Sequence, residues 1–295
     1  MVRSGIMFEF IKSKKTTEQE DTPEAARRLM EEAESYNEND ETKKAEKLYR
    51  KAYEIYAGLY KEDPQLYRDE AAGCCECLGD ILQSLEKYQD AYEHFAIAVD
   101  LYHDEAESGS PKYRELVADD YCNMGDTYFF RSRYEDAEKY YMRALEIYEA
   151  LYTQKPEKFK EDIAYCYDCL AKAQSGFENY TSAVEYYEKV IEIYAEILAS
   201  KAETSDEAEL NGYNDDLAAA YSDIGYAYSC TKDYEDAEHY YLMAAELYKK
   251  LAAADRDEYA DSLASQYEDL AALYEDMEKP ELQKEYAVKA KNLDI

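Results

Sequence analysis

Small and aromatic positions recur along this chain at a nearly constant interval. A small residue, directly after an apolar one in every case but the first, recurs at Ala33, Gly79, Gly125, Ala171, Gly225 and Ala271. The steps between these positions are 46, 46, 46, 54 and 46 residues. A second series with the same steps fails at Gln283 and consists of Ala45, Ala91, Ala137, Ala183 and Ala237. Self-similarity at a fixed period predicts a repeat architecture, here with a degenerate last repeat.

Each repeat has the apolar pattern of two helices joined by a short turn. In the third repeat, the apolar face of the first helix consists of Tyr121, Met124, Gly125 and Tyr128. Residues 131–134 form the turn, and the second helix is lined by Ala137, Tyr141, Ala144, Leu145 and Tyr148. The small residues let the two helices approach closely. Because one pair cannot bury its apolar face, neighbouring pairs are expected to stack into a solenoid.

The single long step places eight extra residues in one connection. A third series, of aromatic residues, has its own long step between Phe159 and Tyr213, which confines the extra residues to the segment between about Val190 and Tyr213. This series consists of Tyr67, Tyr113, Phe159, Tyr213 and Tyr259. We expect a polar loop at residues 201–212, which is either a binding loop or a tolerated extension. Pro64, Pro111 and Pro156 fall between repeats and predict helix breaks there.

The pattern resembles the tetratricopeptide repeat, whose members carry an aromatic, then Leu-Gly, Tyr, Ala, an aromatic and Ala at fixed offsets. In the fifth repeat these positions are Tyr221, Ile224, Gly225, Tyr228, Ala237, Tyr241 and Ala244. Four features depart from the family: the period exceeds the usual 34 residues by 12, the closing proline is absent from its usual place, tryptophan is absent, and Gln174 replaces a tyrosine. The resemblance implies an all-α, right-handed α-α superhelical solenoid of about six helix pairs over residues 23–295, with longer helices than usual.

The first 22 residues precede the repeats. Their apolar patch, Ile6 to Ile11, is too short for a membrane span or a signal-peptide core. We expect a mobile tail, with Met7 as an alternative start and a basic amphipathic anchor as the alternative function.

Acidic residues dominate the charge. The chain has 68 Asp and Glu against 34 Lys and Arg, a net charge of −34, which opposes binding to phosphate backbones and to anionic lipid. We therefore expect no nucleic acid and no membrane among the partners, and solubility is the simplest explanation of the total charge. The seven cysteines, an odd number without a secretory signal, favour reduced thiols in a cytoplasmic protein.

Catalytic and metal-binding motifs are weak. Cys74, Cys75 and Cys77, together with Cys166 and Cys169, are compatible with zinc, but their helical period favours small apolar core residues. The histidines are scattered, and no phosphate loop, nucleophile elbow or HExxH occurs. The acidic pair Asp119-Asp120 is not completed by an acid at Asn123. We expect no enzyme activity, no cofactor and no bound metal.

The resemblance also implies a binding surface, because the first helix of each family repeat lines a concave groove. The residues at the family's ligand-facing offsets that we select are Glu76, Asp80, Asp119, Asp126, Phe129, Tyr165, Asp168 and Tyr226. Only Arg27 and Lys172 are basic at such offsets, so the groove is predicted to attract a basic or basic-aromatic peptide segment. The alternative is that these acids form a solvated face of an acidic protein.

The leading functional hypothesis is a non-catalytic protein–protein interaction module or scaffold. A sensor or regulator that takes a peptide or small ligand into the same groove is the alternative. Homo-oligomerisation through the repeat ends is a third hypothesis, favoured if the last helix, residues 281–293, exposes an apolar face.

Overall fold

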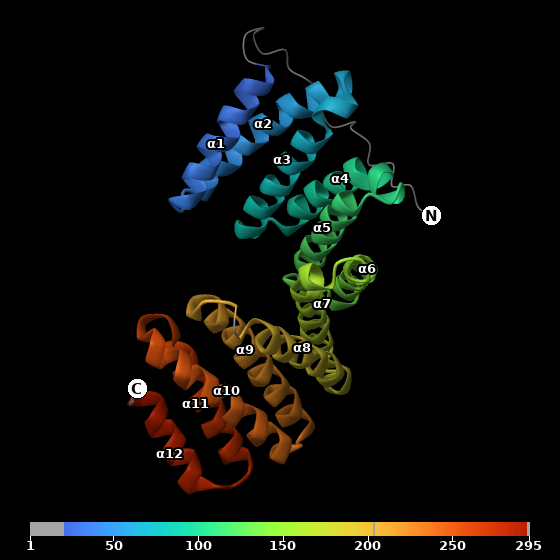
Figure 1. Ribbon diagram of the computed structural model, residues 1–295. Helices are drawn as coiled ribbons and strands as arrows, with labels where there is room; N and C mark the ends of the chain where they lie inside the picture. Colours follow the sequence, from blue (N-terminus) through green and yellow to red (C-terminus); the bar gives the residue numbers. More distant parts are fainter. Residues whose placement is uncertain (1–20, 203, 294–295) are drawn as a thin grey trace. The chain divides into compact units, whose positions relative to one another are not determined.

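The computed structural model describes residues 21–202 and 204–293, and this part of the chain forms twelve α-helices without a strand (Figure 1). The predicted all-α fold is confirmed. Residues 1–20 of the expected tail lie outside the described residues.

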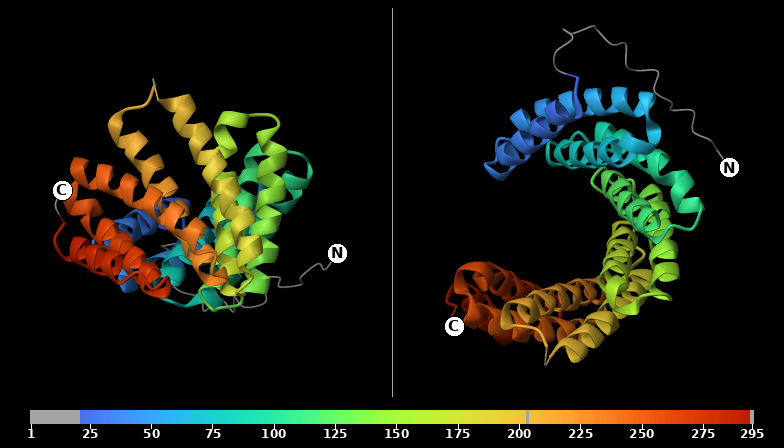
Figure 2. Two further views of the ribbon diagram at one scale, coloured as in Figure 1. Left: turned by 90° about the horizontal axis from the view of Figure 1, so that it is seen from below. Right: turned by 45° about the horizontal axis from the view of Figure 1, so that its top comes forward.

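The helices fall into two compact units, one ending at Arg131 and the other beginning at Ser132. The N-terminal unit contains α1 (Pro23–Glu38), α2 (Thr42–Glu62), α3 (Pro64–Ser84), α4 (Tyr88–Glu107) and α5 (Pro111–Phe129). The C-terminal unit contains α6 (Tyr134–Tyr152), α7 (Pro156–Gly176), α8 (Tyr180–Lys201), α9 (Glu207–Thr231), α10 (Tyr234–Ala254), α11 (Arg256–Asp276) and α12 (Pro280–Lys291). Within each unit, helices that are consecutive in the chain pack side by side (Figures 1 and 2).

Glycine is needed where the two helices of a repeat come closest. A Cβ atom added to Gly79 on α3 would lie 2.5 Å from the Phe95 ring of α4. One added to Gly225 on α9 would lie 2.6 Å from the Tyr241 ring of α10. Both rings are buried, so the small-residue series does mark the close helix approach that the pattern predicts.

The turn between the two helices of a repeat has one backbone geometry throughout the chain. A single non-glycine residue with φ between 55° and 66° occurs in each such turn: Asp40, Glu86, Ser132, Glu178, Lys232 and Glu278. Their spacing repeats the 46, 46, 46, 54 and 46 steps of the sequence. The N–H of the following residue bonds to a carbonyl five residues earlier, as from Lys87 to Leu82 at 2.8 Å, which is a Schellman motif.

The predicted breaks between repeats are confirmed, because Pro64, Pro111 and Pro156 begin α3, α5 and α7. The first helical position has no intrahelical use for an N–H, and the fixed φ of proline suits it.

The predicted loop at residues 201–212 is wrong. Helix α8 continues to Lys201 and α9 already begins at Glu207, so half of the expected loop, residues 207–212, belongs to α9, which has 25 residues. The side chain of Asp206 caps this helix by accepting a hydrogen bond from the N–H of Glu209 at 2.9 Å. Two hydrogen bonds hold the beginning of α9 against α8 and α7. The Lys201 ammonium of α8 donates to Glu209 at 2.6 Å, and the Tyr213 hydroxyl donates to Glu161 of α7 at 2.7 Å.

Gln174 replaces the usual tyrosine without losing its contact. Its amide donates to Glu138 of the preceding second helix, α6, at 2.8 Å. Tyr274, at the equivalent position of the last repeat, donates its hydroxyl to Glu238 of α10 at 2.7 Å. Both pairs are separated by 36 residues, so the glutamine preserves a hydrogen bond between adjacent repeats.

The last repeat ends in a short helix. Helix α12 has 12 residues and none of them is buried, although Leu282 and Tyr286 pack against the cluster that includes Leu270 and Tyr274 of α11. This is the repeat in which the alanine series fails at Gln283.

Candidate peptide-binding surfaces

In the N-terminal unit, the structure brings together three of the predicted carboxylates, Glu76 and Asp80 from α3 and Asp119 from α5. Glu76 is half-buried and accepts a hydrogen bond from the Tyr102 hydroxyl, but burial and the charges of Asp119 and Asp80 raise the pKa of its carboxyl. Asp80 is accessible to solvent, yet partial burial raises the pKa of its carboxyl to about 6. Asp119 is exposed. These residues form an acidic cluster with an open edge.

Asp126 and Phe129 lie farther along α5, seven and ten residues after Asp119. Both are half-buried. The Phe129 ring packs edge-on against Phe130 at 5.9 Å between centroids, and Phe130 stacks on Tyr88 at 5.6 Å. Because Phe130 is 56% exposed, the end of α5 presents an accessible aromatic surface.

In the C-terminal unit, the Asp168 carboxylate already forms an ion pair with a lysine of the same chain. The Lys172 Nζ lies 2.7 Å from Asp168 Oδ2 on the same helix and 3.8 Å from Asp223 Oδ2 on α9. The sequence pattern identified both residues, but it treated Asp168 as an open acceptor. The two units therefore differ in how their acids are satisfied.

The two predicted tyrosines of the C-terminal unit are accessible. Tyr165 on α7 is 43% exposed and Tyr226 on α9 is 54% exposed. The Tyr226 ring lies edge-on to Tyr180 at 6.2 Å. Accessible tyrosines supply apolar contact area together with a hydroxyl group.

The sequence pattern did not single out Asp120 as a site residue, although its position in the repeat distinguishes it. The same buried position of the first helices carries Cys74, Asp120, Cys166, Ala220 and Gln266. Asp120 is 1% exposed, and neither of its carboxyl oxygens has a hydrogen-bond partner among the described residues. Burial, followed by the charges of Glu76, Asp119 and Asp80, raises the pKa of Asp120 well above its usual value. Aligning the repeats would have revealed a charged residue at a core position.

The cysteines occupy core positions rather than a metal-binding arrangement. Cys74 and Cys75 are buried on α3, where burial raises the pKa of both thiols, and the Cys74 Sγ lies 3.5 Å from the carbonyl of Tyr49. Cys166 and Cys169 are buried on α7. Within residues 21–202 and 204–293, no group of three or more His, Cys, Asp or Glu side chains is arranged to hold a metal ion.

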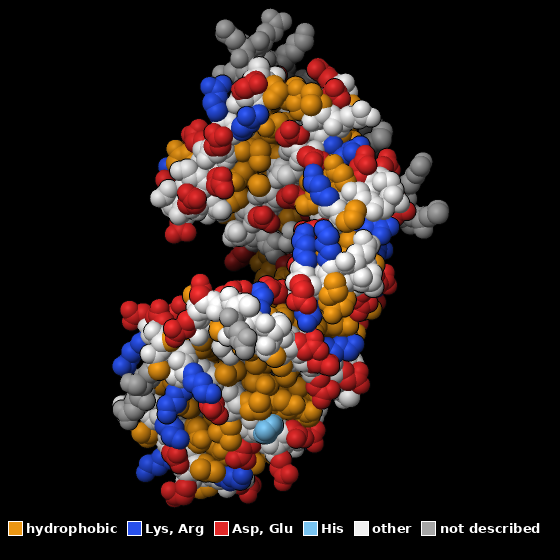
Figure 3. All heavy atoms as spheres, in the orientation of Figure 1, with side chains coloured by type: hydrophobic (Ala, Val, Ile, Leu, Met, Phe, Trp, Pro, Cys, Tyr) orange, Lys and Arg blue, Asp and Glu red, His pale blue; other side chains and the backbone are white. Residues whose placement is uncertain are grey.

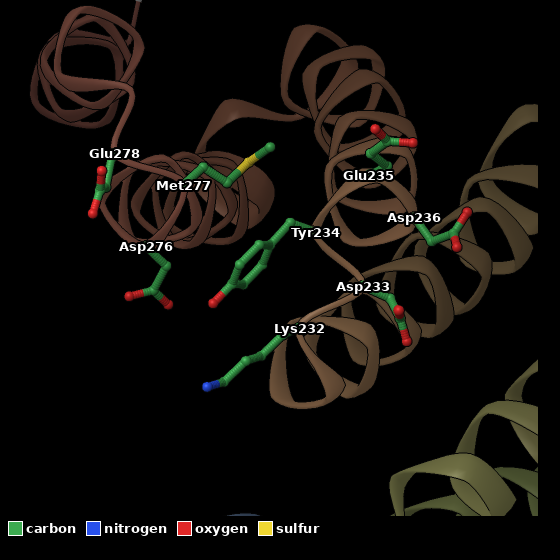
Figure 4. Close-up of a pocket in the computed structure, with 8 residues that line it drawn as sticks. All are labelled: Lys232, Asp233, Tyr234, Glu235, Asp236, Asp276, Met277 and Glu278. Carbon is green, nitrogen blue, oxygen red and sulfur yellow. The ribbon is translucent and has the colours of Figure 1, made fainter.

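A cavity of about 560 Å³ lies away from all eight predicted residues (Figure 4). It is a depression between the turn joining α9 to α10 and the turn joining α11 to α12. Its lining consists of Lys232, Asp233, Tyr234, Glu235, Asp236, Asp276, Met277 and Glu278. In Figure 4, Tyr234 projects between the two turns and the Lys232 ammonium points away from them. We assign no site to this open depression.

Acidic side chains are spread over the face of both units drawn in Figure 3. General acidity alone therefore does not distinguish a site. Among the described residues, no helix has the length and apolar character required to cross a membrane.

Comparison with solved structures identifies the fold. BtubC (BKLC) from P. vanneervenii is 17% identical and matches over 90% of each chain, with a TM-score of 0.61. The nearly identical TPR-like repeats from Podosopora anserina are 18% identical, with a TM-score of 0.56 over 80% of this chain and 99% of theirs. The apo form of RapI is 16% identical, with a TM-score of 0.54 over 93% of this chain and 85% of its own. At these identities the likeness shows the fold alone.

Sequence comparison identifies the family. No curated protein matches the chain. Tetratricopeptide repeat models match residues 72–150, 163–200 and 217–255, which together make up more than half of the chain. These segments include the helix pairs in which the close approach at Gly79 and Gly225 was observed. The chain belongs to the tetratricopeptide repeat family.

Proposed function

We propose that this protein is a non-catalytic interaction module that binds a basic segment of a partner protein along the exposed faces of its first helices. Tetratricopeptide repeats are generally protein–protein interaction modules. The observation that carries the proposal is the cluster of Glu76, Asp80 and Asp119, which has an accessible edge on α3 and α5. Such a cluster attracts Lys or Arg and repels an acidic segment.

Aromatic residues support the same function. Phe129 and Phe130 end the acidic face of α5, and Tyr165 and Tyr226 are accessible in the C-terminal unit. Aromatic side chains with an exposed face can pack on the aliphatic part of a partner's lysine or on the plane of an arginine. Asp168 contributes less, because Lys172 already neutralises it.

A capture experiment with matched baits tests this function. The acid variant carries Asp119→Asn and Asp126→Asn, and the aromatic variant carries Tyr165→Ala and Tyr226→Ala. Matched controls change exposed residues of second helices, Glu54→Gln with Asp104→Asn and Met142→Ala with Leu242→Ala. Far-UV circular dichroism verifies that every bait is folded.

The proposal is supported if a partner is retained by both controls and lost by either test variant, and if a synthetic segment of that partner loses affinity when its Lys and Arg become Gln. A partner retained by all baits refutes binding on these faces.

We further propose a cytoplasmic location, because five of the seven cysteines are buried as reduced side chains in the helical core, where a reducing compartment would keep them. The sensor hypothesis differs in its ligand, which would be a free peptide or small molecule instead of a protein segment. Self-association through α12 also remains a proposal, and Val288, 50% exposed, provides an apolar residue for it.

A further inference from the structure

The two units carry different charges at the same two positions of the repeat. Glu76 and Asp80 lie four residues apart on α3, and Asp168 and Lys172 lie four residues apart on α7. Each residue of the second pair follows its counterpart by 92 residues, which is two repeats of 46. An acid and a base therefore occupy these positions in the C-terminal unit, whereas two acids occupy them in the N-terminal unit.

The C-terminal pair, Asp168 and Lys172, shows that a positively charged group can lie at this position of the repeat. The ammonium of Lys172 bonds to Asp168 at 2.7 Å and reaches Asp223 of the next first helix at 3.8 Å. Burial acts to lower the pKa of Lys172, but the two carboxylates outweigh it and the pKa is raised. A cation bridging adjacent first helices is thus stable at this position of the fold.

In the N-terminal cluster, Glu76 stands in the place of Asp168 and Asp80 in the place of Lys172. Asn123 stands in the place of Asp223, and Asp119 supplies the carboxylate of the next first helix. Asp80 and Asp119 are accessible at its edge and Glu76 is half-buried. Burial raises the pKa of both Glu76 and Asp80, and the neighbouring negative charges add to the effect at Glu76.

Asp120 is a second and independent indication. Its carboxyl group is 1% exposed and has no hydrogen-bond partner among the described residues, and it is close enough to Glu76 for the two charges to repel. Gln266, at the same position of the last repeat, is also buried without a partner, but its amide is neutral. Within residues 21–202 and 204–293, Asp120 is the one buried acid found without a hydrogen-bond partner, and it adjoins other acids. An unsatisfied buried polar group requires an explanation.

We propose that the cluster of Glu76, Asp80, Asp119 and Asp120 is a binding site for one lysine or arginine side chain of the partner segment. The ammonium or guanidinium takes the place that the chain's own Lys172 has in the C-terminal unit. It enters past Asp80 and Asp119 and bonds to Glu76, and its positive charge favours the ionised form of the buried Asp120 carboxyl group, which burial and the neighbouring acids disfavour. This inference rests on the proposed function and identifies the subsite that reads the positive charge.

A charge swap taken from the chain itself tests the site. Asp80→Lys recreates the Asp168–Lys172 arrangement in α3, so it should fold and should fill the site internally. Glu54→Lys makes the same change of net charge at an exposed position of α2. The probe is a fluorescein-labelled peptide, acetyl-(Gly-Arg)₄-amide, and its Kd is measured by fluorescence anisotropy at 150 mM NaCl.

We expect Asp80→Lys to weaken probe binding at least about tenfold, because it removes one charge-assisted contact and adds a repulsive one. Glu54→Lys should change the Kd by less than about twofold, because salt screens an exposed distant charge. In the wild type, the probe should slow hydrogen exchange in α3 and α5. Asp80→Asn serves as a second variant, with an intermediate loss expected.

If Asp80→Lys and Glu54→Lys weaken probe binding equally, the proposed site is refuted. It is also refuted if the probe slows hydrogen exchange only in helices other than α3 and α5. The proposed function fails separately. If a partner is lost by the acid or aromatic variant of the capture experiment but retained by Asp80→Lys, the interaction module stands and the cation site does not. If all variants retain the partner, both are refuted.

Discussion

The close approach of α3 and α4 makes Gly79→Ala a sharp test of the helix packing. The added Cβ would lie 2.5 Å from Cε1 of Phe95, about 1 Å inside an ordinary carbon–carbon contact. Phe95 is 0% exposed, so its ring has no free space into which to turn. Overpacking of this kind costs roughly 1–3 kcal/mol, against a gain of about 1 kcal/mol from replacing a helical glycine by alanine. The net expectation is a loss of roughly 1 kcal/mol.

Gly58→Ala is the matched control. Gly58 also lies within a helix of the N-terminal unit, α2, but an added Cβ would meet nothing within 4 Å. Only the propensity gain remains, and we expect stabilisation by about 1 kcal/mol. The two alanine substitutions should therefore differ by roughly 1–3 kcal/mol, which is the overpacking energy alone.

Hydrogen exchange is the appropriate assay, because a repeat protein need not unfold in one step and a global midpoint would then mix several transitions. The free energy of opening is compared for amides of α2 and of α3 and α4 in the wild type and both variants. If Gly79→Ala protects α3 and α4 as much as Gly58→Ala protects α2, the helices are not packed as closely as described and the reasoning is refuted.

Substitutions at three further positions test other features. Glu86→Gly should stabilise the turn between α3 and α4 by about 1 kcal/mol, because φ of 58° is strained for a residue with a side chain; unchanged or faster exchange in this turn would contradict this. Gln174→Leu should lower the free energy of opening of α6 and α7 in hydrogen exchange by roughly 1–3 kcal/mol, because Glu138 and Asn179 both lose a hydrogen-bond partner. Gln174→Tyr should be nearly neutral, and equal losses would argue against the shared contact. The pKa of Asp223 is raised to about 6, so the folded state holds its proton more tightly than the unfolded state and stability should increase as pH falls from 6 to 4. Asp223→Asn should reduce the difference between the free energies of opening of α9 amides at pH 4.5 and pH 7.5 in hydrogen exchange, and an unchanged difference would contradict the assignment. The groups that face Asp223 are Lys172, Asp168, Tyr187 and Asp269.

The periodicity of the sequence predicted the helix pairs and the close contacts at Gly79 and Gly225. A small residue on the first helix of a repeat and a large aromatic residue on the second recur together, and these are the residues that pack against each other. It located the insert but not its structure. Repeat spacing counts extra residues without indicating whether they are helical. The capping residue Asp206 and the acids at Glu207 and Glu209 carried that information locally.

The candidate site was predictable in part. The positions of Glu76, Asp80 and Asp119 follow from the family offsets, but their electrostatics depend on burial, which one helix pattern does not reveal. The spacing of Asp168 and Lys172 was itself a sign of an ion pair, because residues four apart on a helix are neighbours. The sequence of the turns did not indicate their geometry. Glycine is the usual residue at a position with positive φ after a helix, and this chain has Glu86 or Lys232 there.

The hydrogen bond from Gln174 to Glu138 affects where the chain can be shortened. It joins a second helix to the first helix of the following repeat, so a fragment that stops at Tyr152, the end of α6, exposes the surface of α6 on which α7 packs and leaves Glu138 without that donor. A fragment that continues to Gly176 keeps α7 over that surface. Because α8 packs on α7 as α7 packs on α6, the longer fragment keeps the donor to Glu138 but exposes α7 in turn, so any shortened chain needs a last helix whose outer face has been made polar.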